Sequence, residues 1–176
     1  IHAYANAMKQ RPERFLLKFA HEMNNGAWSP VYPSVTPEQF VLMWRHVHDI
    51  FTTEGVTNVE WVWAPIYQSY PNVPENSLYN YYPGDSHVDW VGLCGLNYYV
   101  QMPVGAQPWY TFDDLFGSGL RELACRYAKP QMIHEMASVD DAQHIYSKTA
   151  WIADAYQAMQ NYPLLRAVVW FNDSDY

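Results

Sequence analysis

Short apolar runs recur along the chain, separated by turn residues or by longer amphipathic stretches. Five runs have the length and the β-branched or aromatic content of buried strands. They cover residues 14–20, 58–64, 88–97, 131–135 and 166–171. Polar side chains end these runs or follow within two residues, namely Glu22, Asn97, Glu135 and Asn172. The pattern therefore predicts five strands with chemistry-bearing residues at their carboxyl ends.

Amphipathic stretches separate most of the predicted strands. The clearest helix begins after Thr36, where Pro37 suits the first turn and Gln39 completes a capping box. Apolar residues then recur at helical spacing on one face: Phe40, Met43, Trp44, Val47, Ile50 and Phe51. Gly55 stands where a C-terminal cap is expected. His46 and His48 of this helix are expected to be surface or packing residues.

Three further helices are expected. One occupies the first ten or so residues and ends near Pro12; the others cover residues 113–127, capped by Thr111, and 142–162, capped by Asp140 or Asp141. The stretch 67–84 is rich in Tyr, Pro and Asn and is expected to be a long surface loop.

Alternation of strands and helices predicts an α/β fold with a parallel sheet covered by helices. In both barrel and doubly wound versions of this fold, ligands bind at the carboxyl ends of the strands. A closed (β/α)8 barrel has eight strands and about 250 residues. We therefore expect residues 1–176 to be the C-terminal part of one barrel domain, carrying roughly strands 4 to 8.

Composition excludes some partners. Ten basic residues against eighteen acidic ones give a net charge of −8, without a basic cluster, which argues against nucleic acid. No long stretch lacks charged or turn residues, so no membrane partner is expected. Cys94 and Cys125 match neither a disulfide framework nor a zinc pattern and are expected to be free thiols. No cofactor and no metal site are expected.

Aromatic residues are unusually abundant, with fifteen Tyr, eight Trp and seven Phe. Many stand beside Pro, Gly and Asn in loop-like stretches, which suits the binding of neutral sugars. Large rings also fill cores, and composition leaves both explanations open.

The two strand-end glutamates, Glu22 and Glu135, are the candidate catalytic pair. A retaining glycosidase has two carboxyl groups about 5–5.5 Å apart, one as acid/base and one as nucleophile. A single such glutamate is often only solvated or ion-paired, but two, each after a His, favour catalysis. A metal site formed with His21 and His134 is disfavoured, because adjacent strand residues point to opposite faces.

Six sequence blocks carry a family resemblance over nearly the whole chain. They are KFAHEMNNGAW, PEQFVLMWRHVHDIF, TNVEWVWAP, YPGDSHVDWVGL, KPQMIHEMAS and RAVVWFN. In their order and spacing they resemble the second half of glycoside hydrolase family 26. The resemblance implies a retaining (β/α)8 hydrolase acting on β-linked polysaccharide, most often β-1,4-mannan.

The resemblance also implies residue roles. Glu22, at the end of the fourth barrel strand, would be the acid/base, and Glu135, at the end of the seventh, the nucleophile. His21 would position the sugar or the nucleophile. The expected substrate-binding residues are Trp28, Trp63, Asn97, Tyr98 and Trp170.

Two positions depart from the family pattern. Asn25 is an apparent insertion between HEMN and Trp28. Leu96 stands where family members commonly carry a Tyr that hydrogen-bonds the nucleophile, and Tyr98 is a possible substitute.

The resemblance predicts an endo-acting β-1,4-mannanase. The alternatives are a β-1,3-1,4-glucanase, a β-1,3-xylanase and a non-catalytic glycan-binding barrel, which the Leu96 departure keeps open. The expected partner is a polysaccharide, the full-length protein is expected to be a monomer, and the substrate class implies a secreted or extracellular location.

Overall fold

The computed structural model describes residues 1–26, 29, 31–97, 109–140 and 147–172. The chain divides into two compact units, Ile1–Val91 and Gly92–Tyr176. The expectation that both belong to one catalytic domain stays a prediction. No helix in the described residues is long and apolar enough to cross a membrane.

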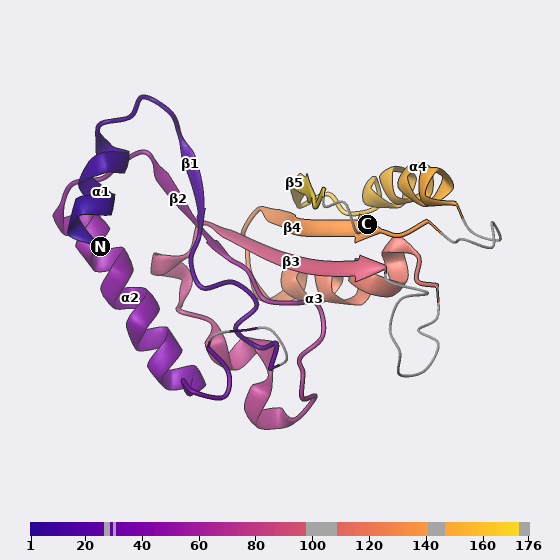
Figure 1. The fold of residues 1–176 in the computed structure, drawn as a ribbon, viewed down its shortest axis with the longest axis horizontal. Coiled ribbons are helices and arrows are strands. Elements are labelled where there is room, and N and C mark those ends of the chain that lie inside the picture. Colours follow the sequence, from indigo (N-terminus) through magenta and orange to yellow (C-terminus); the bar gives the residue numbers. More distant parts are fainter. Residues whose placement is uncertain (27–28, 30, 98–108, 141–146, 173–176) are drawn as a thin grey trace. The chain divides into compact units, whose positions relative to one another are not determined.

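All five predicted strands are present within the described residues (Figure 1). They are β1 (Phe15–Lys18), β2 (Val59–Trp63), β3 (Trp90–Asn97), β4 (Gln131–Ser138) and β5 (Leu165–Trp170). They form one sheet in the order β1-β2-β3-β4-β5, and the pairs β1–β2, β2–β3 and β4–β5 are parallel. A doubly wound sheet reverses its strand order, whereas this sheet follows the chain, as in a (β/α)8 barrel. The predicted α/β class is therefore confirmed.

The expected helices are also present, as α1 (His2–Lys9), α2 (Pro37–Thr53), α3 (Ser118–Arg126) and α4 (Lys148–Met159). The capping box of α2 is formed, because the Gln39 amide donates to Thr36 Oγ1 and the Thr36 amide donates to Gln39 Oε1. Gly55 has φ of 70° and ends α2 in the left-handed conformation that glycine adopts without a steric penalty. A π-helical turn, Asp113–Gly117, precedes α3.

The start of α4 differs from the prediction. Its first residue is Lys148 and its N-cap is Ser147, whose hydroxyl accepts from the Ala150 amide. Asp140, an expected cap, does accept a hydrogen bond of 2.8 Å from the Lys148 amide, although eight residues separate the two. Residues 141–146, where the helix was expected to begin, lie outside the described residues.

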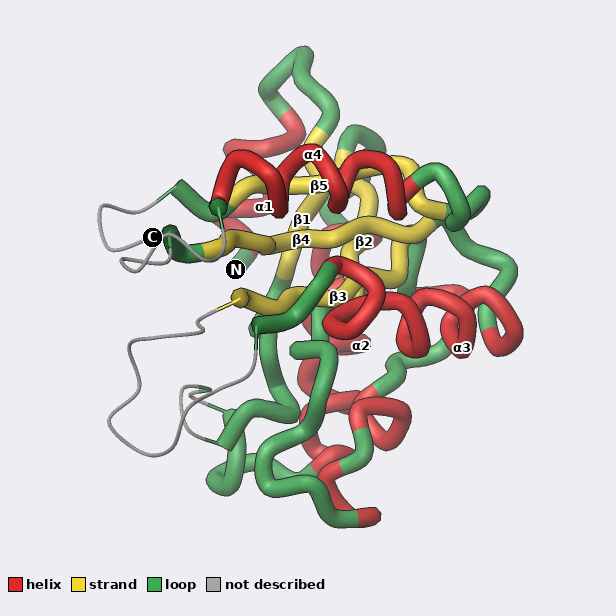
Figure 2. The backbone as a smooth tube through the Cα atoms, turned by 90° about the vertical axis from the view of Figure 1, so that its right-hand side faces the viewer, coloured by secondary structure: helices red, strands yellow, loops and turns green. Residues whose placement is uncertain are grey.

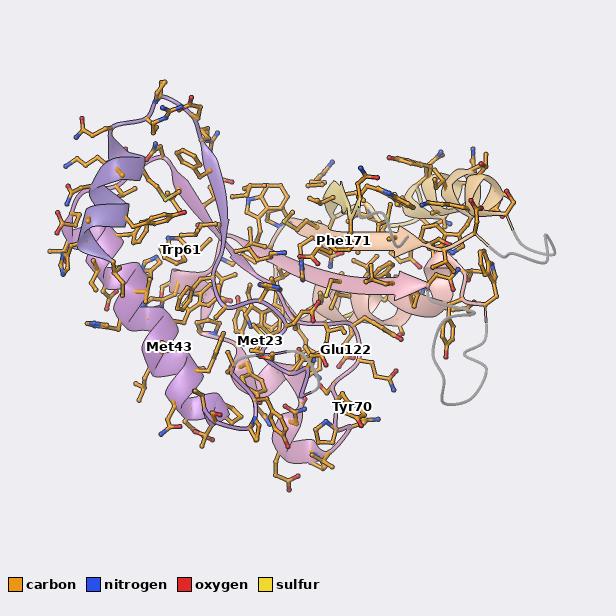
Figure 3. The ribbon with its side chains drawn as sticks, viewed as in Figure 1. Met23, Met43, Trp61, Tyr70, Glu122 and Phe171 are labelled. Atoms are coloured by element: carbon orange, nitrogen blue, oxygen red, sulfur yellow. The ribbon has the colours of Figure 1, made fainter. Side chains whose placement is uncertain are left out.

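The core of the first unit lies between α2 and β2. Trp44 and Phe51 of α2 place their rings 5.8 and 5.1 Å from that of Trp61 on β2. All three side chains are buried, and Figure 3 labels Trp61 in this position. The predicted apolar face of α2 is therefore the face that packs on the sheet.

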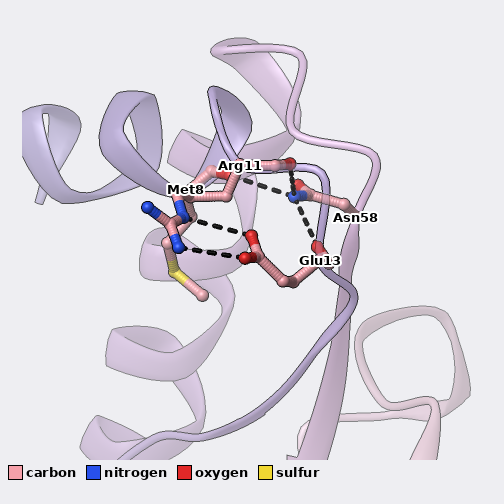
Figure 4. Close-up of polar contacts among 4 residues, drawn as sticks. All are labelled: Met8, Arg11, Glu13 and Asn58. Carbon is pink, nitrogen blue, oxygen red and sulfur yellow. Dashed lines mark hydrogen bonds and ion pairs between the residues drawn. The ribbon is translucent and has the colours of Figure 1, made fainter.

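Asn58 closes the turn between α1 and β1 (Figure 4). Its Nδ2 donates to the carbonyl oxygens of Met8, Arg11 and Glu13 at 2.9–3.0 Å. The Arg11 guanidinium and the Glu13 carboxylate form an ion pair of 2.9 Å across the same turn. One side chain at the start of β2 thus holds the chain that enters β1.

The stretch 67–84 is more ordered than the surface loop we expected. It contains two short 3-10 helices, Pro74–Asn76 and Leu78–Tyr81, and a third, Asp85–His87, follows. Asn76 and Tyr81 are buried, and the Tyr81 hydroxyl donates to Asn76 Oδ1 at 2.8 Å. Asn76 Nδ2 also donates to the Asn24 carbonyl at 2.9 Å, and such a contact with a distant part of the chain leaves no local pattern in the sequence.

In the second unit, α3 packs closely against β3 and β4. A Cβ atom on Gly119 of α3 would lie 2.7 Å from a terminal methyl group of Leu93 on β3, so a larger residue there would force the Leu93 side chain to move. Gln131 of β4 is buried and donates to the Leu120 carbonyl of α3 at 2.9 Å. Figure 2 shows α4 running along β4 and β5.

Candidate active site

The loop after β1 holds Glu22 on a strained backbone. Ala20 and Glu22 have φ of 46° and 55°, the left-handed region that residues with a Cβ atom seldom adopt. Each such residue costs about 1–2 kcal/mol, so tertiary contacts must hold it. The Glu22 amide provides one, because it donates at 2.8 Å to the carbonyl oxygen of Ala64, just after β2. Such strain is characteristic of functional loops.

The Glu22 carboxylate has an oriented neighbour. Asn25, which is buried, donates from Nδ2 to Glu22 Oε2 at 2.9 Å. The Asn25 backbone amide also donates to the Glu22 carbonyl oxygen at 2.9 Å. Glu22 itself is partly exposed, so a solvated ligand can reach it. The apparent insertion Asn25 is therefore a contact residue of the proposed acid/base.

Met23 and Asn24 anchor this loop in the first unit. Met23 is fully buried (Figure 3). Asn24 is also fully buried; its Nδ2 donates to the Ile66 carbonyl and to Ser69 Oγ, and its Oδ1 accepts from the Ile66 amide. We expected no role for Asn24, although an amide two residues after the motif glutamate was a signal. His21 remains exposed, and its positioning role stays a prediction.

Glu135 lies in an irregular part of β4. Ile133 pairs with Val168 and Met136 with Trp170, so three steps along β4 match two steps along β5. This extra residue is the mark of a β-bulge, a device that re-aims side chains and recurs next to active sites. Glu135 is partly exposed, while its neighbours His134 and Met136 are buried. The bulge also means that simple strand alternation does not describe His134 and Glu135.

Asn97 has a structural role in the second unit, and its expected contact with substrate stays a prediction. It is fully buried; its Nδ2 donates to Ser138 Oγ and its Oδ1 accepts from the Tyr110 amide, both at 3.1 Å. The Asn97 carbonyl oxygen accepts from the Val139 amide. Its polar atoms thus tie the ends of β3 and β4 to the segment before α3.

Trp63 likewise packs in the core instead of lining a cleft. Its side chain is fully buried, and the indole Nε1 donates to the Tyr81 carbonyl at 3.1 Å. The Tyr82 ring stands 5.1 Å from it, edge to face. No ring face of Trp63 reaches solvent in this structure, and its contact with substrate stays a prediction.

Trp170, at the end of β5, is partly exposed. Its ring lies 6.1 Å from that of Trp151 and 5.7 Å from Lys148 Nζ, so a cation borders the ring. Its role in substrate binding stays a prediction. Trp28 and Tyr98, the other expected platforms, lie outside the described residues. Leu96 is partly exposed at the end of β3 and offers no hydroxyl group to a neighbour.

The second unit also contains a pocket of about 340 Å3 that the sequence analysis missed. Two tryptophans and two aspartates are among its lining residues: Trp109, Asp113, Trp151 and Asp154. Tyr162 donates to Asp113 Oδ1 at 2.6 Å, and burial, then this hydrogen bond, raises the pKa of Tyr162. The aromatic excess of the sequence was the one signal for this pocket.

Glu22 belongs to the first unit and Glu135 to the second, and the retaining separation of their carboxyl groups stays a prediction. Each residue stands after or within a strand of the same parallel sheet, as expected. A pair of carboxylates is what glycoside hydrolysis requires.

Comparison with known proteins gives a family. The sequence matches the model of glycosyl hydrolase family 26 over residues 1–119. Endoglucanase H of Acetivibrio thermocellus is 34% identical over 177 residues, which cover 97% of this chain and 19% of that protein. The chain thus spans less than a quarter of that relative.

Solved structures show the same fold. The catalytic domain of a Bacillus sp. JAMB-750 endo-β-1,4-mannanase has a TM-score of 0.68 and 17% identity, and 99% of this chain covers 47% of that chain. Bacillus subtilis mannanase BCman has a TM-score of 0.62 and 21% sequence identity. The match covers 99% of this chain and 46% of that chain. A Sorangium cellulosum endo-β-1,3-glucanase has a TM-score of 0.65 and 19% sequence identity. The match covers 99% of this chain and 67% of that chain. The fold is therefore part of a (β/α)8 barrel, and the chain belongs to glycosyl hydrolase family 26.

Proposed function

We propose that the protein is a retaining, endo-acting β-glycoside hydrolase with β-1,4-mannan as its substrate. Glu22 is the acid/base and Glu135 the nucleophile. The observation that carries this proposal is the family match over residues 1–119, which includes Glu22 and its strained, hydrogen-bonded loop. Glu135 lies beyond that range, and the β-bulge around it supports its role.

The chemistry proceeds by double displacement. Glu22 protonates the leaving glycosidic oxygen while the Glu135 carboxylate attacks the anomeric carbon and forms a glycosyl-enzyme ester. Glu22, now ionised, removes a proton from water, which attacks the same carbon and releases Glu135. The Asn25 amide donates to one Glu22 oxygen and so fixes the orientation of the carboxyl group. The partly exposed ring of Trp170 offers an apolar face to the sugar.

A second candidate substrate is β-glucan. The relative named an endoglucanase is 34% identical to this chain, whereas the mannanases BCman and that of Bacillus sp. JAMB-750 are 21% and 17% identical. Leu96, in place of the tyrosine common in the family, also favours a departure from the typical mannanase. Both observations concern specificity and leave the two-glutamate mechanism unchanged.

The test is a substrate screen with the full-length protein. Mannan, galactomannan, lichenan and β-1,3-xylan are incubated with the protein, and the released reducing ends are measured. We expect the fastest release from mannan; faster release from lichenan would assign the second candidate. The E22Q/E135Q double variant is the control for contaminating activity. Binding of these polymers without any release would instead identify a glycan-binding barrel.

The same proposal includes the location and assembly of the protein. A polymeric β-glycan lies outside cells, so we propose that the protein is secreted. We also propose that the full-length protein acts as a monomer. Fractionation of the native organism and light scattering of the full-length protein test these two points.

A further inference from the structure

Two histidines and an aspartate meet on one side of the first unit. His48 and Asp49 belong to α2, and His87 is the last residue of the 3-10 helix Asp85–His87. One ligand atom from each residue lies within 4.8 Å of the other two. Asp49 Oδ1 is 3.5 Å from His48 Nδ1 and 3.7 Å from His87 Nε2.

The ring nitrogen Nδ1 of His48 has no hydrogen-bond partner among the described residues. His48 Nδ1 is buried from solvent, and Asp49 Oδ1 lies 3.5 Å from it, beyond good hydrogen-bond range. A buried polar atom without a partner costs about 1–3 kcal/mol, and such atoms often mark an unfilled ligand position. The His48 ring is held in place by the Trp61 ring, 5.2 Å away.

His87 is oriented by contacts on its other side. Its Nδ1 lies 2.9 Å from Ser86 Oγ, while its Nε2 faces Asp49. Its carbonyl oxygen accepts from Trp44 Nε1 at 3.0 Å, and its amide donates to the Gly84 carbonyl. A hydrogen bond to one ring nitrogen that leaves the other nitrogen facing a metal is the usual support of a metal-binding histidine.

We propose that His48, Asp49 and His87 bind a late first-row divalent cation, with Zn2+ as the natural occupant. Two imidazoles and one carboxylate are ligands that Zn2+ accepts, and water completes the tetrahedron. With bonds of about 2.0–2.1 Å, neighbouring ligand atoms of a tetrahedral ion lie roughly 3.3 Å apart. The two distances from Asp49 Oδ1, 3.5 and 3.7 Å, exceed this by a few tenths of an ångström. Rotation of the exposed Asp49 side chain can adjust these two distances, and the ligand atoms of the two histidines already lie within 4.8 Å of each other.

Arg45 opposes the binding of a cation. Its guanidinium lies near this region, with Nε donating to the Pro83 carbonyl at 2.7 Å. A fixed positive charge nearby weakens the site, so we expect micromolar affinity, below that of closed structural zinc sites. The bound ion links α2 to the 3-10 helix that precedes β3, and it therefore stabilises the first unit. This proposal does not depend on the proposed hydrolase activity.

The experiment is a calorimetric titration of the metal-free protein with ZnCl2. We expect one site with a Kd of about 1–10 μM, near the affinity given by a few unstrained ligands. H48Q, D49N and H87Q should each weaken binding at least tenfold. The matched control is H46Q, an exposed histidine of the same helix, which should bind as the unmodified protein does. Co2+ should give visible absorption bands, and Mg2+, which prefers oxygen ligands, should not bind.

Circular dichroism shows whether each variant is folded. D49N alters an exposed side chain, 67% accessible, and keeps the test decisive if a histidine variant fails to fold. Absence of Zn2+ binding to the unmodified protein overturns the proposal. Equal weakening by H46Q and D49N overturns it too, because the metal would then be held by surface histidines in general.

Discussion

The side-chain amide of Asn25 donates a hydrogen bond of 2.9 Å to the Glu22 carboxylate, from three residues along the same loop. The backbone of Glu22 is left-handed, and its amide is bound to Ala64. Main chain and side chain of the proposed acid/base are therefore each fixed by a separate contact. This relationship leads to the first prediction.

N25A should lower kcat roughly 10- to 100-fold with little change in KM, because the Glu22 carboxylate loses its orientation while sugar contacts persist. The measurement is steady-state kinetics on the polysaccharide that the screen identifies. N161A, which alters an exposed asparagine just after α4, is the control and should leave kcat unchanged. Unchanged kcat in N25A would show that the hydrogen bond does not position Glu22 for catalysis.

Azide should rescue the two glutamate variants with opposite stereochemistry. In E135A, azide attacks from the vacated face of the substrate and gives a glycosyl azide of inverted anomeric configuration. In E22A, azide attacks the covalent intermediate on Glu135 and gives the retained anomer. NMR of the products from an activated aryl β-glycoside distinguishes them. The same anomer from both variants would contradict the assigned roles.

Trp63 and Trp170 should respond to substitution in opposite ways. W63A should destabilise the protein by about 3–5 kcal/mol, because a large buried ring leaves a cavity. W170A should cost far less stability, since the ring is partly exposed, and should raise KM because a stacking face is lost. Urea unfolding and steady-state kinetics measure the two effects. A raised KM in W170A without weaker polysaccharide binding would argue against the stacking role.

Tyr81 should make the protein sensitive to alkali. Burial raises the pKa of Tyr81 to about 12, while an unfolded tyrosine has a pKa of about 10. The unfolded state therefore loses this proton first. The stabilisation is complete below about pH 10, falls as pH rises from there, and is lost by about pH 12, which removes up to about 3 kcal/mol.

Urea unfolding measured from pH 8 to 11 tests this expectation for Tyr81 (roughly the range around the unfolded pKa). Y81F should be somewhat less stable at neutral pH, because its hydrogen bond to Asn76 is lost, but its stability should fall less steeply above pH 10. Y156F, which alters an exposed tyrosine, is the control and should keep the original slope. Parallel curves for Y81F and the unmodified protein would refute this account of Tyr81.

Local patterns within the sequence determined the elements and their order. The five apolar runs became strands, and Thr36 and Gln39 capped α2 as the spacing predicted, because such contacts join residues only a few positions apart. The sequence blocks also led to the family, since HEMN and MIHEMAS stand at strand ends in the expected order. The alternating order of strands and helices was sufficient to predict the parallel sheet.

Only the tertiary structure decided which face of each side chain is covered. Trp63 and Trp170 both lie within apolar runs, but the segment around Tyr81 packs on Trp63, which is buried, whereas Trp170 is partly exposed. Likewise, the left-handed backbone of Glu22 depends on Ala64, and the meeting of His48 with His87 depends on residues 39 positions apart. These properties arise from contacts between distant segments, and a periodic pattern carries no information about which distant segment will pack against a residue.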